Sequence, residues 1–528
     1  MTQALTDHTS VHFGTDGWRA IIGDDFNTLT VARVAAAAAT IFREDHPAPV
    51  SASAPAAAPA SAPGTPAGSP DPAPNTIIIG YDTREDAGRY AVLAATVLAS
   101  YGFDIVISDA YCPTPTLCWS VASNPAAVGG VMLTSSHNPA EYLGIKLRMS
   151  DGGASPASFT ARVEAALNDQ APACYAEALA NFEVAVNGTP DAPARPLARA
   201  CYLHFSNLVA PYLTHLAASV DVSAIAAAKL RVVVDPLFGA GRGYLAGLLT
   251  QLGVTVVEVN GAQDSSFDGL HPEPIAPWIK RGAQKVVELS FDACFITDGD
   301  ADRIGAVDAQ GSFVNPHRIL ALVIAHLVED KKLTGRVVRT LSGSNLIRLQ
   351  CERLGLPLTT TPIGFKWIYE QMLAGDVLVG GEESGGIGIP THVRERDGLL
   401  MALLLTELMA QRGQTLQQLV SNMLAQLGGF EYARRDLRLS SVQKEAFLAA
   451  HVALGGTSIE PYTKRFESIG QKLGALTRED GLKLEFVSGA WLLMRPSGTE
   501  PLVRVYAEAP THEQVEALLN VGCALVTG

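Results

Sequence analysis

The sequence predicts an α/β protein with three similar α/β/α domains containing mixed sheets, followed by a smaller α+β C-terminal domain, around a central cleft. Three observations lead to this prediction. Short apolar runs rich in β-branched residues alternate with helical stretches over most of the chain, which is typical of α/β domains. Three of these runs continue directly into polar loops, and the last hundred or so residues have closely spaced strands and a final helix. A length of 528 residues also exceeds what one hydrophobic core usually supports.

The first domain contains an interruption. A helix is expected over residues 29–43 and a strand over Thr76-Ile-Ile-Ile-Gly80. Between them, residues 46–74 are almost entirely Ala, Pro, Ser and Gly. Such a segment has too little large apolar side chain to offset the entropy of ordering it, so we expect a disordered insertion.

Later strands and loops repeat one architectural unit. Further buried strands are expected at residues 104–107, 131–133, 230–234, 255–259, 293–296 and 376–379. Polar loops follow three of them, at residues 134–139, 298–303 and 381–386. Because open parallel sheets bind ligands at the carboxyl ends of their strands, we expect the three loops to converge on one cleft.

The C-terminal part reads as a smaller, mainly antiparallel domain. Strands are expected at residues 482–486, 491–494 and 502–506, with a helix after Thr511. The resulting domain boundaries are 1–190, 191–311, 312–427 and 428–528.

Composition narrows the classes of partner. A formal net charge of -14 argues against nucleic acid and acidic membrane surfaces, which are met by clustered Lys and Arg. The seven cysteines form no C-x-x-C pair and are expected to be reduced core thiols. The sequence begins without a signal-peptide pattern and has no apolar run of about 20 residues, so a cytoplasmic location is expected. The oligomeric state, monomer or dimer, is left open.

The loop Asp298-Gly-Asp-Ala-Asp-Arg303 predicts a metal site. Three carboxylates alternate along it directly after an apolar strand, and a few carboxylates completed by water or phosphate oxygens suit Mg²⁺ better than Ca²⁺. An EF-hand loop requires Gly at its sixth position and Glu at its twelfth, where this chain has Arg303 and Ala309.

Two further loops carry hydroxyl and cationic groups. Thr134-Ser-Ser-His-Asn-Pro139 places hydroxyls beside His137, which is suited to proton transfer. Serine requires activation by a base, a metal or prior modification, and a cation held by three carboxylates would also bind an oxygen on a phosphorylated Ser136. Arg495-Pro-Ser-Gly-Thr499 with Arg504 suits a phosphate, and Gly381-Glu-Glu-Ser384 adds acceptors for sugar hydroxyls.

These loops, in this order, resemble the α-D-phosphohexomutase superfamily, which includes phosphoglucomutases, phosphomannomutases and phosphoglucosamine mutases. The resemblance spans nearly the whole chain. It also rests on the segments His12-Phe-Gly-Thr-Asp-Gly-Trp-Arg19, Tyr81-Asp-Thr-Arg84, Asp235-Pro-Leu-Phe-Gly-Ala-Gly241, Thr361-Pro-Ile-Gly-Phe-Lys366 and His392-Val-Arg-Glu-Arg-Asp-Gly398.

The resemblance implies a role for each loop. Ser136 would carry the phosphoryl group, with Arg19, His137 and Lys146 around the reacting phosphate. Mg²⁺ would be held by Ser136, Asp298, Asp300 and Asp302. Substrate contacts would come from Arg303, Gly364, Lys366, Glu382, Ser384 and Arg396, and the phosphate that does not react would be held by Arg495, Ser497, Gly498, Thr499 and Arg504.

The implied reaction moves phosphate between C1 and C6 of a hexose through a bisphosphate that turns around in the cleft. The fourth domain would pivot onto the ligand to retain this intermediate. Arg396 stands where glucose-type relatives have Lys or Arg, which favours phosphoglucomutase activity with glucose 1,6-bisphosphate as intermediate and activator. The account requires Ser136 to lie near Asp300 with its side chain reachable from solvent.

Two departures from the resemblance and several alternatives remain open. Many relatives have Asn-Gly shortly before the lysine that aligns with Lys146, where this chain has Leu143-Gly144. Gly386 replaces a His found in some relatives, so the general base is not assigned. Phosphomannomutase or dual activity is the nearest alternative, followed by phosphoglucosamine mutase, a phosphoserine-forming sugar phosphatase and a non-catalytic sugar-phosphate sensor.

Overall fold

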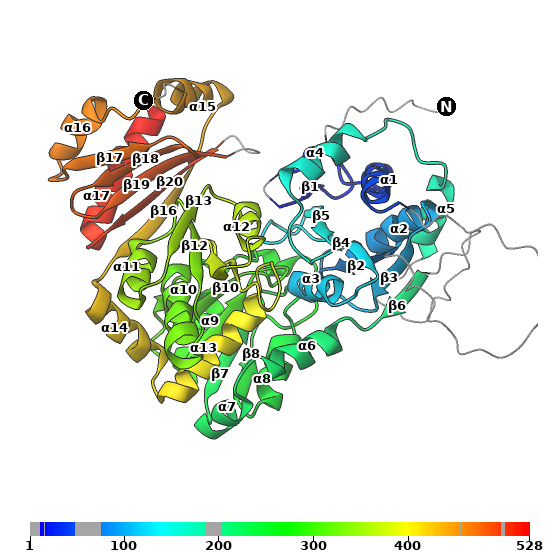
Figure 1. Cartoon of the computed structure of the whole chain (residues 1–528), viewed down its shortest axis with the longest axis horizontal. Helices are drawn as coiled ribbons and strands as arrows, with labels where there is room; N and C mark the ends of the chain where they lie inside the picture. Colours follow the sequence, from blue (N-terminus) through cyan, green and yellow to red (C-terminus); the bar gives the residue numbers. More distant parts are fainter. Residues whose placement is uncertain (1–10, 15, 48–74, 185–202, 454–455, 498–501) are drawn as a thin grey trace, which may run out of the picture. The chain divides into compact units, whose positions relative to one another are not determined.

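The structure is a computed structural model that describes residues 11–14, 16–47, 75–184, 203–453, 456–497 and 502–528. The expected insertion at 46–74 therefore lies almost wholly outside the described residues. The described residues divide into two compact units, which Figure 1 shows coloured along the chain. Unit 1 lies within residues 1–13, 17–214 and 263–271, and unit 2 within residues 14–16, 215–262 and 272–528.

Unit 1 is built on a mixed six-stranded sheet. Its spatial order is β1 (Trp18–Ile21), β5 (Tyr142–Met149), β4 (Ala127–Leu133), β2 (Thr76–Tyr81), β3 (Asp104–Ser108) and β6 (Leu203–Ser206). The strands β4, β2, β3 and β6 run parallel to one another. Strand β5 is antiparallel to both of its neighbours, β1 and β4. Its helices are α1 (Thr28–Asp45), α2 (Ala87–Ser100), α3 (Thr114–Ala122), α4 (Ala157–Ala165) and α5 (Tyr175–Val184).

The central strand β2 shows why this sheet is covered on both faces. Ile77 and Ile79 join the core formed with α1 and α2, and Ile78, only 2% exposed, alternates to the opposite face. Helix α3 also contacts β2. A continuous β-branched run is the pattern expected of a strand buried on both faces.

Unit 2 contains three sheets. The first has the order β11 (Phe313–Val314), β10 (Ile304–Asp308), β9 (Ala293–Thr297), β7 (Arg231–Asp235) and β8 (Thr255–Glu258). The second has the order β13 (Leu358–Thr361), β12 (Arg336–Thr340), β14 (Val377–Gly381) and β15 (Ile387–Gly388). The first sheet has two parallel and two antiparallel strand pairs, and the second has two parallel pairs and one antiparallel pair.

Helices accompany these two sheets. They are α7 (Val222–Ala228), α8 (Tyr244–Gln251), α9 (Lys280–Glu288), α10 (Pro316–Ala325), η2 (His326–Asp330), α11 (Asn345–Leu354), α12 (Phe365–Met372), α13 (Gly398–Arg412) and α14 (Leu416–Leu427). Helix α6 (Val209–Ala218) spans the change from unit 1 to unit 2, and η1 (Phe267–Gly269) belongs to unit 1.

The third sheet of unit 2 is antiparallel throughout. Its order is β16 (Glu431–Arg438), β20 (Leu502–Ala509), β19 (Trp491–Pro496), β18 (Leu482–Phe486) and β17 (Leu473–Thr477). Its helices are α15 (Ser441–Phe447), η3 (Leu448–Val452), α16 (Glu460–Glu467) and α17 (His512–Thr527), and α17 packs its apolar side against β20.

The predicted fold class is confirmed, with three sheets of mixed direction and one antiparallel sheet in the C-terminal part. Each of the three polar loops, at residues 134–139, 298–303 and 381–386, begins where a strand ends: after β4, after β9 and at the last residue of β14. The strands β1, β5, β6, β10 to β13 and β15 to β17 were not predicted. Among the described residues no single helix is long and apolar enough to cross a membrane, although the bent pair α6 and α7 passes that test by length and composition.

Candidate functional site

Ser136 lies in a strained turn directly after β4. Its φ of 52° is in the left-handed region, which a non-glycine residue adopts only when its surroundings enforce it. The Ser136 amide donates to Thr134 Oγ1 at 2.9 Å, and the Thr134 hydroxyl donates to Asp82 Oδ2 at 2.6 Å. The buried Asp82 carboxylate therefore stabilises the turn through the Thr134 hydroxyl.

Arg84 holds the same turn through its backbone. One terminal nitrogen donates to the carbonyl oxygens of Ser136 and Asn138, at 2.7 and 2.6 Å. The other donates to those of Pro139 and Tyr142, at 2.6 and 2.9 Å. Its Nε pairs with Asp82 Oδ2 at 3.1 Å, and neither side chain is exposed. This buried ion pair fixes the conformation of the Ser136 loop.

Three of the predicted catalytic residues lie around this turn or on the strand beside it. His137 Nδ1 is 3.4 Å from Ser136 Oγ, and Arg19 donates to Asn138 Oδ1 at 2.6 Å. Lys146 is buried on β5, which pairs with β4. The Ser136 side chain itself is only 1% exposed, so the expectation of a serine reachable from solvent is wrong for this structure.

Of the pair Leu143-Gly144, the glycine, which the Asn-Gly of relatives also has, is required by local packing. A Cβ at Gly144 would overlap the Trp18 carbonyl oxygen and lie 2.8 Å from the Thr134 carbonyl oxygen. Backbone cannot retreat as a flexible side chain can, so β5 requires glycine where it passes between β1 and the Ser136 loop.

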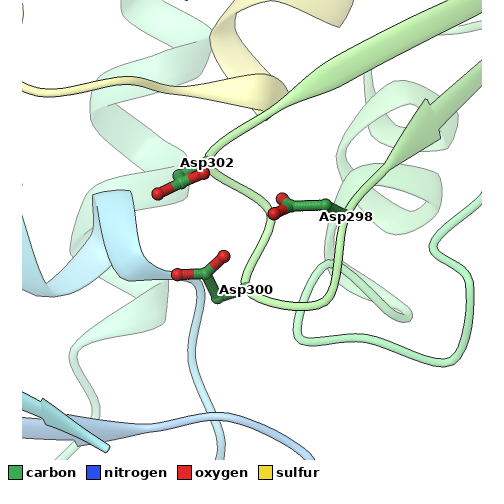
Figure 2. Close-up of side chains that lie close together, drawn as sticks. All are labelled: Asp298, Asp300 and Asp302. Carbon is green, nitrogen blue, oxygen red and sulfur yellow. The ribbon is translucent and has the colours of Figure 1, made fainter. Parts of the chain in front are cut away.

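The three aspartates of the predicted metal loop come together in unit 2. Asp298, Asp300 and Asp302 follow β9, are all fully buried, and each offers a carboxylate oxygen within 4.8 Å of the others. Figure 2 shows the three carboxylates lying close together along the loop. Buried carboxylates at such separations repel one another unless a cation is near, and their hard oxygen donors fit a divalent cation such as Mg²⁺.

Two arginines supply positive charge beside this triad. Arg303 Nε lies 3.9 Å from Asp298 Oδ2 and 3.8 Å from Asp302 Oδ1, and its amide donates to Asp298 Oδ1 at 3.1 Å. Burial works against the charged form of Arg303, yet Asp298 and Asp302 raise its pKa above the ordinary value. Arg303 therefore stays charged at the metal loop.

Arg396 contacts both the predicted metal loop, residues 298–303, and the predicted sugar-binding loop, residues 381–386, which is called the sugar loop below. Its guanidinium contacts Asp302 Oδ2 at 2.9 Å and Glu382 Oε2 at 3.6 Å. It also pairs with Glu395 at 3.0 Å and with Asp16, which belongs to the same unit. The pKa of Arg396 is raised despite burial, because carboxylates surround it. Asp16 and Glu395 were not predicted as site residues.

The sugar loop after β14 lies against the metal loop. Arg303 forms a β-bridge with Gly386, and the Ile304 amide donates to the Gly385 carbonyl oxygen at 3.0 Å. Burial raises the pKa of Glu382 to about 7, although Arg396 opposes the rise. Two of the three predicted loops thus meet in unit 2, as the sequence led us to expect.

The remaining residues predicted to contact substrate lie at two places in unit 2. Gly364 adopts a φ of 130° and is the N-cap of α12, and the Lys366 ammonium lies 5.3 Å from the ring centre of Trp367. Ser384 is half-buried in the loop that begins at Gly381.

The predicted phosphate-binding residues lie on the antiparallel sheet. Arg495 and Arg504 are direct partners across β19 and β20. Like charges directly opposite each other destabilise a sheet, and here each has a carboxylate nearby, Asp480 at 3.0 Å and Asp436 at 3.7 Å. Ser497 is buried at the end of β19, whereas Gly498 and Thr499 lie outside the described residues.

Comparison with known proteins identifies the family. Four phosphoglucomutase/phosphomannomutase models match consecutive parts of the chain: domain I at 67–173, domain II at 210–311, domain III at 315–427 and the C-terminal domain at 442–520. A phosphoglucomutase/phosphomannomutase of Thermococcus kodakarensis is 30% identical over 450 residues, covering 85% of this chain and 89% of its own. This chain belongs to the α-D-phosphohexomutase superfamily.

Other relatives of this phosphohexomutase are named after different sugar substrates. A phosphoglucosamine mutase of a Parafrankia species is 30% identical over 513 residues, covering 95% of both chains. A crystal structure described as a putative phosphomannomutase of Thermus thermophilus superposes with a TM-score of 0.77 at 30% identity, covering 98% of this chain and 99% of its own. The protein is therefore an isomerase that acts as an intramolecular phosphotransferase on phosphorylated hexoses.

Family membership does not assign the individual residues. Arg19, Ser136, His137 and Lys146 belong to unit 1, and the metal, sugar and phosphate residues belong to unit 2. Their roles, and the meeting of Ser136 with the aspartates, stay predictions. Arg84 and Asp82 were visible in the Tyr81-Asp-Thr-Arg84 segment, but their support of the Ser136 loop was not inferred from it.

Proposed function

We propose that this phosphohexomutase is a phosphoglucomutase that interconverts glucose 1-phosphate and glucose 6-phosphate through a phosphoserine at Ser136. The observation that carries the choice of glucose is Arg396, whose buried guanidinium bridges Asp302 of the metal loop and Glu382 of the sugar loop. Glucose-type members of the superfamily have Lys or Arg at this place. A cation between both loops would help to orient a sugar hydroxyl and the reacting phosphate together.

Phosphoryl transfer depends mainly on positioning and on neutralising charge on the equatorial oxygens. In the first half-reaction the bond from phosphorus to Ser136 Oγ breaks as a bond from phosphorus to the sugar hydroxyl oxygen forms; the sugar hydroxyl gives up its proton and Ser136 Oγ takes one up. Arg84 keeps the serine turn rigid during this exchange, and His137, 3.4 Å from Ser136 Oγ, handles the proton at the serine side. Lys146 and Arg19 offset the negative charge of the phosphoryl group.

The buried aspartates are the proposed magnesium ligands. Asp298, Asp300 and Asp302 would hold the ion together with an oxygen of phosphorylated Ser136. When bound, the cation supplies charge neutralisation to phosphoryl oxygens. The second half-reaction returns the other phosphate of glucose 1,6-bisphosphate to Ser136.

The choice of glucose is tested by coupled assays on glucose 1-phosphate and mannose 1-phosphate, with Mg²⁺ and glucose 1,6-bisphosphate present. We expect kcat/KM to favour glucose by at least about tenfold, which corresponds to about 1.4 kcal/mol of transition-state discrimination. A tenfold preference for mannose would overturn the substrate. Steady release of inorganic phosphate without isomerisation would overturn the mutase assignment in favour of a phosphatase.

The carrier role is tested at Ser136 directly. Ser136→Ala should abolish turnover and leave the circular dichroism spectrum and melting temperature close to wild type. Its neighbour Ser135, also buried, provides the matched control Ser135→Ala, which should remain active. Because Ser136 is buried, it has to become reachable during turnover. Intact-mass spectrometry after incubation with glucose 1,6-bisphosphate should show one added phosphoryl group in wild type and none in Ser136→Ala. Equal labelling of both proteins would contradict the assignment.

A further inference from the structure

Asp480 joins two binding segments that come from different sheets of unit 2. It lies in the turn between β17 and β18, on the antiparallel sheet. Its Oδ2 accepts from Arg495 Nε at 3.0 Å and from the Ile363 amide at 2.9 Å. Arg495 is the predicted phosphate ligand, and Ile363 precedes Gly364 and Lys366 in the predicted sugar-binding segment. One carboxylate oxygen therefore contacts both.

The local backbone fixes Asp480 in this place. Gly481 follows it with a φ of 107°, and a Cβ on Gly481 would overlap the Met494 carbonyl oxygen and lie 3.0 Å from Arg495 Cα. The turn is thus pressed against β19 at the residue that carries the guanidinium. Only glycine permits both that approach and that backbone conformation.

Ile363 is anchored on the same side. Its side chain is buried in a small cluster with Trp491, Leu493 and Tyr506 of the antiparallel sheet. The cluster holds the segment so that its amide faces Asp480, and moving either partner would separate the donor from the acceptor. The Asp480 contact therefore reports the relative position of the two sheets.

The charge of Asp480 also acts on Arg495. Burial works against the charged form of the Arg495 guanidinium, but Asp480 and further groups, Tyr506 and Glu383, raise its pKa. A guanidinium held at Nε presents its two terminal nitrogens as a planar fork, the geometry that binds phosphate in a bidentate manner.

We propose that Asp480 is a positioning residue that orients Arg495 to bind the phosphate that does not react. Through its contact with the Ile363 amide, it also couples the position of Arg495 to that of the predicted substrate-binding segment that follows Ile363. The inference rests on the proposed function of this site. Asp480 does not touch the substrate; it acts through Arg495 and through the backbone of residue 363. The opposite reading is that Asp480 is a competing anion that weakens the phosphate grip, and the two readings predict opposite changes in affinity.

Other contacts keep the two sheets together when Asp480 is changed. The Asn345 amide donates to Glu508 Oε1 at 2.9 Å, and Asn345 Nδ2 donates to the Gly489 carbonyl oxygen at 2.6 Å. Lys483 Nζ donates to the Leu341 carbonyl oxygen at 2.8 Å. An Asp480 variant is therefore expected to fold.

The test compares Asp480→Asn, Arg495→Ala and the double variant with wild type, and uses Glu479→Gln as the control for loss of an adjacent, exposed carboxylate. KM and kcat are measured with glucose 1-phosphate, and the dissociation constant of glucose 6-phosphate is measured by calorimetry. Asp480→Asn should raise KM and the dissociation constant by about tenfold, the usual effect of losing one charge-assisted hydrogen bond. Glu479→Gln should change neither.

The double variant separates positioning from a general structural effect. Because Asp480 acts in part through Arg495, the affinity lost in the double variant should be clearly smaller than the sum of the two single losses, and any loss beyond Arg495→Ala alone measures the part carried by the backbone of residue 363. Fully additive losses, unchanged affinity or tighter binding in Asp480→Asn would each overturn the inference, as would a melting temperature that falls in proportion to the lost affinity. If wild type binds glucose 6-phosphate without turning it over, the proposed function fails while the calorimetry still decides the role of Asp480.

Discussion

His317 makes the stability of this phosphohexomutase depend on pH in a calculable way. It lies near the start of α10, is 3% exposed, and packs edge-on against Tyr432 with ring centres 4.6 Å apart. Its Nδ1 accepts from the Ser344 amide at 3.4 Å, which requires that nitrogen to be unprotonated. Burial, followed by the charges of Arg339 and Arg318, lowers the pKa of His317 from 6.5 to about 3.

The sign and size of the effect follow from counting protons. Below pH 6.5 the unfolded chain carries a proton on His317 and the folded chain does not, so stability falls as the pH falls. Between pH 7.5 and pH 5 this one group removes about 2 kcal/mol from the free energy of unfolding. At pH 5 the result is governed by the unfolded pKa of 6.5, because the folded value lies well below that pH.

The measurement is urea unfolding at pH 7.5 and pH 5.0, followed by tryptophan fluorescence, for wild type and His317→Gln. Gln keeps a side-chain acceptor but does not titrate. The variant should lose about 2 kcal/mol less stability than wild type between the two pH values, whatever its absolute stability. Equal pH dependence of the two proteins would show that His317 titrates normally when folded, and the reasoning from burial would be refuted.

Three further predictions concern the proposed site. Asp300→Asn should sharply weaken the dependence of activity on Mg²⁺, measured as the concentration giving half-maximal rate, and an unchanged metal titration would remove Asp300 from the ligand set. Arg495→Ala should mainly raise KM while kcat stays near wild type, because it removes binding common to the ground and transition states; an unchanged KM would count against its role. Gly386→Ala should destabilise the protein by about 1–3 kcal/mol in thermal or urea unfolding, since a Cβ there would overlap Arg396 Cδ and lie 3.0 Å from Arg396 Cγ. The loss should shrink in an Arg396→Ala background, and equal losses in both backgrounds would refute the steric explanation.

The strands that were predicted are mostly short, continuous runs of apolar residues. Runs such as Thr76-Ile-Ile-Ile-Gly80 and Ala293-Cys-Phe-Ile296 lie on β2 and β9 as expected. Strand β5 was missed because it carries Gly144, Lys146 and Arg148, and both cations are only 1% exposed. Leu143, Ile145 and Leu147 alternate with these three residues, so the period of a strand was present in the sequence, but the polar positions are buried instead of facing solvent.

The candidate site divides in a similar way. The aspartates of the metal loop could be found because all three stand within five residues and their spacing alone suits a cation. The partners of Arg396 could not, because Asp16 is separated from it by 380 residues. Arg84 binds four backbone carbonyl oxygens, and since every residue has one, such a contact leaves no pattern in the sequence.

The absence of histidine at residue 386 now has a physical reason that bears on the substrate. A side chain at this position would need the space filled by the Arg396 stem, and that guanidinium is fastened to Asp302, Glu395 and Asp16. Arg396 cannot move aside without leaving several buried carboxylates less compensated, which is strongly unfavourable. Glycine at 386 and arginine at 396 are therefore one coupled choice, and under the proposed function the contacts that distinguish hexoses in this loop would come from Arg396 and its neighbours rather than from residue 386.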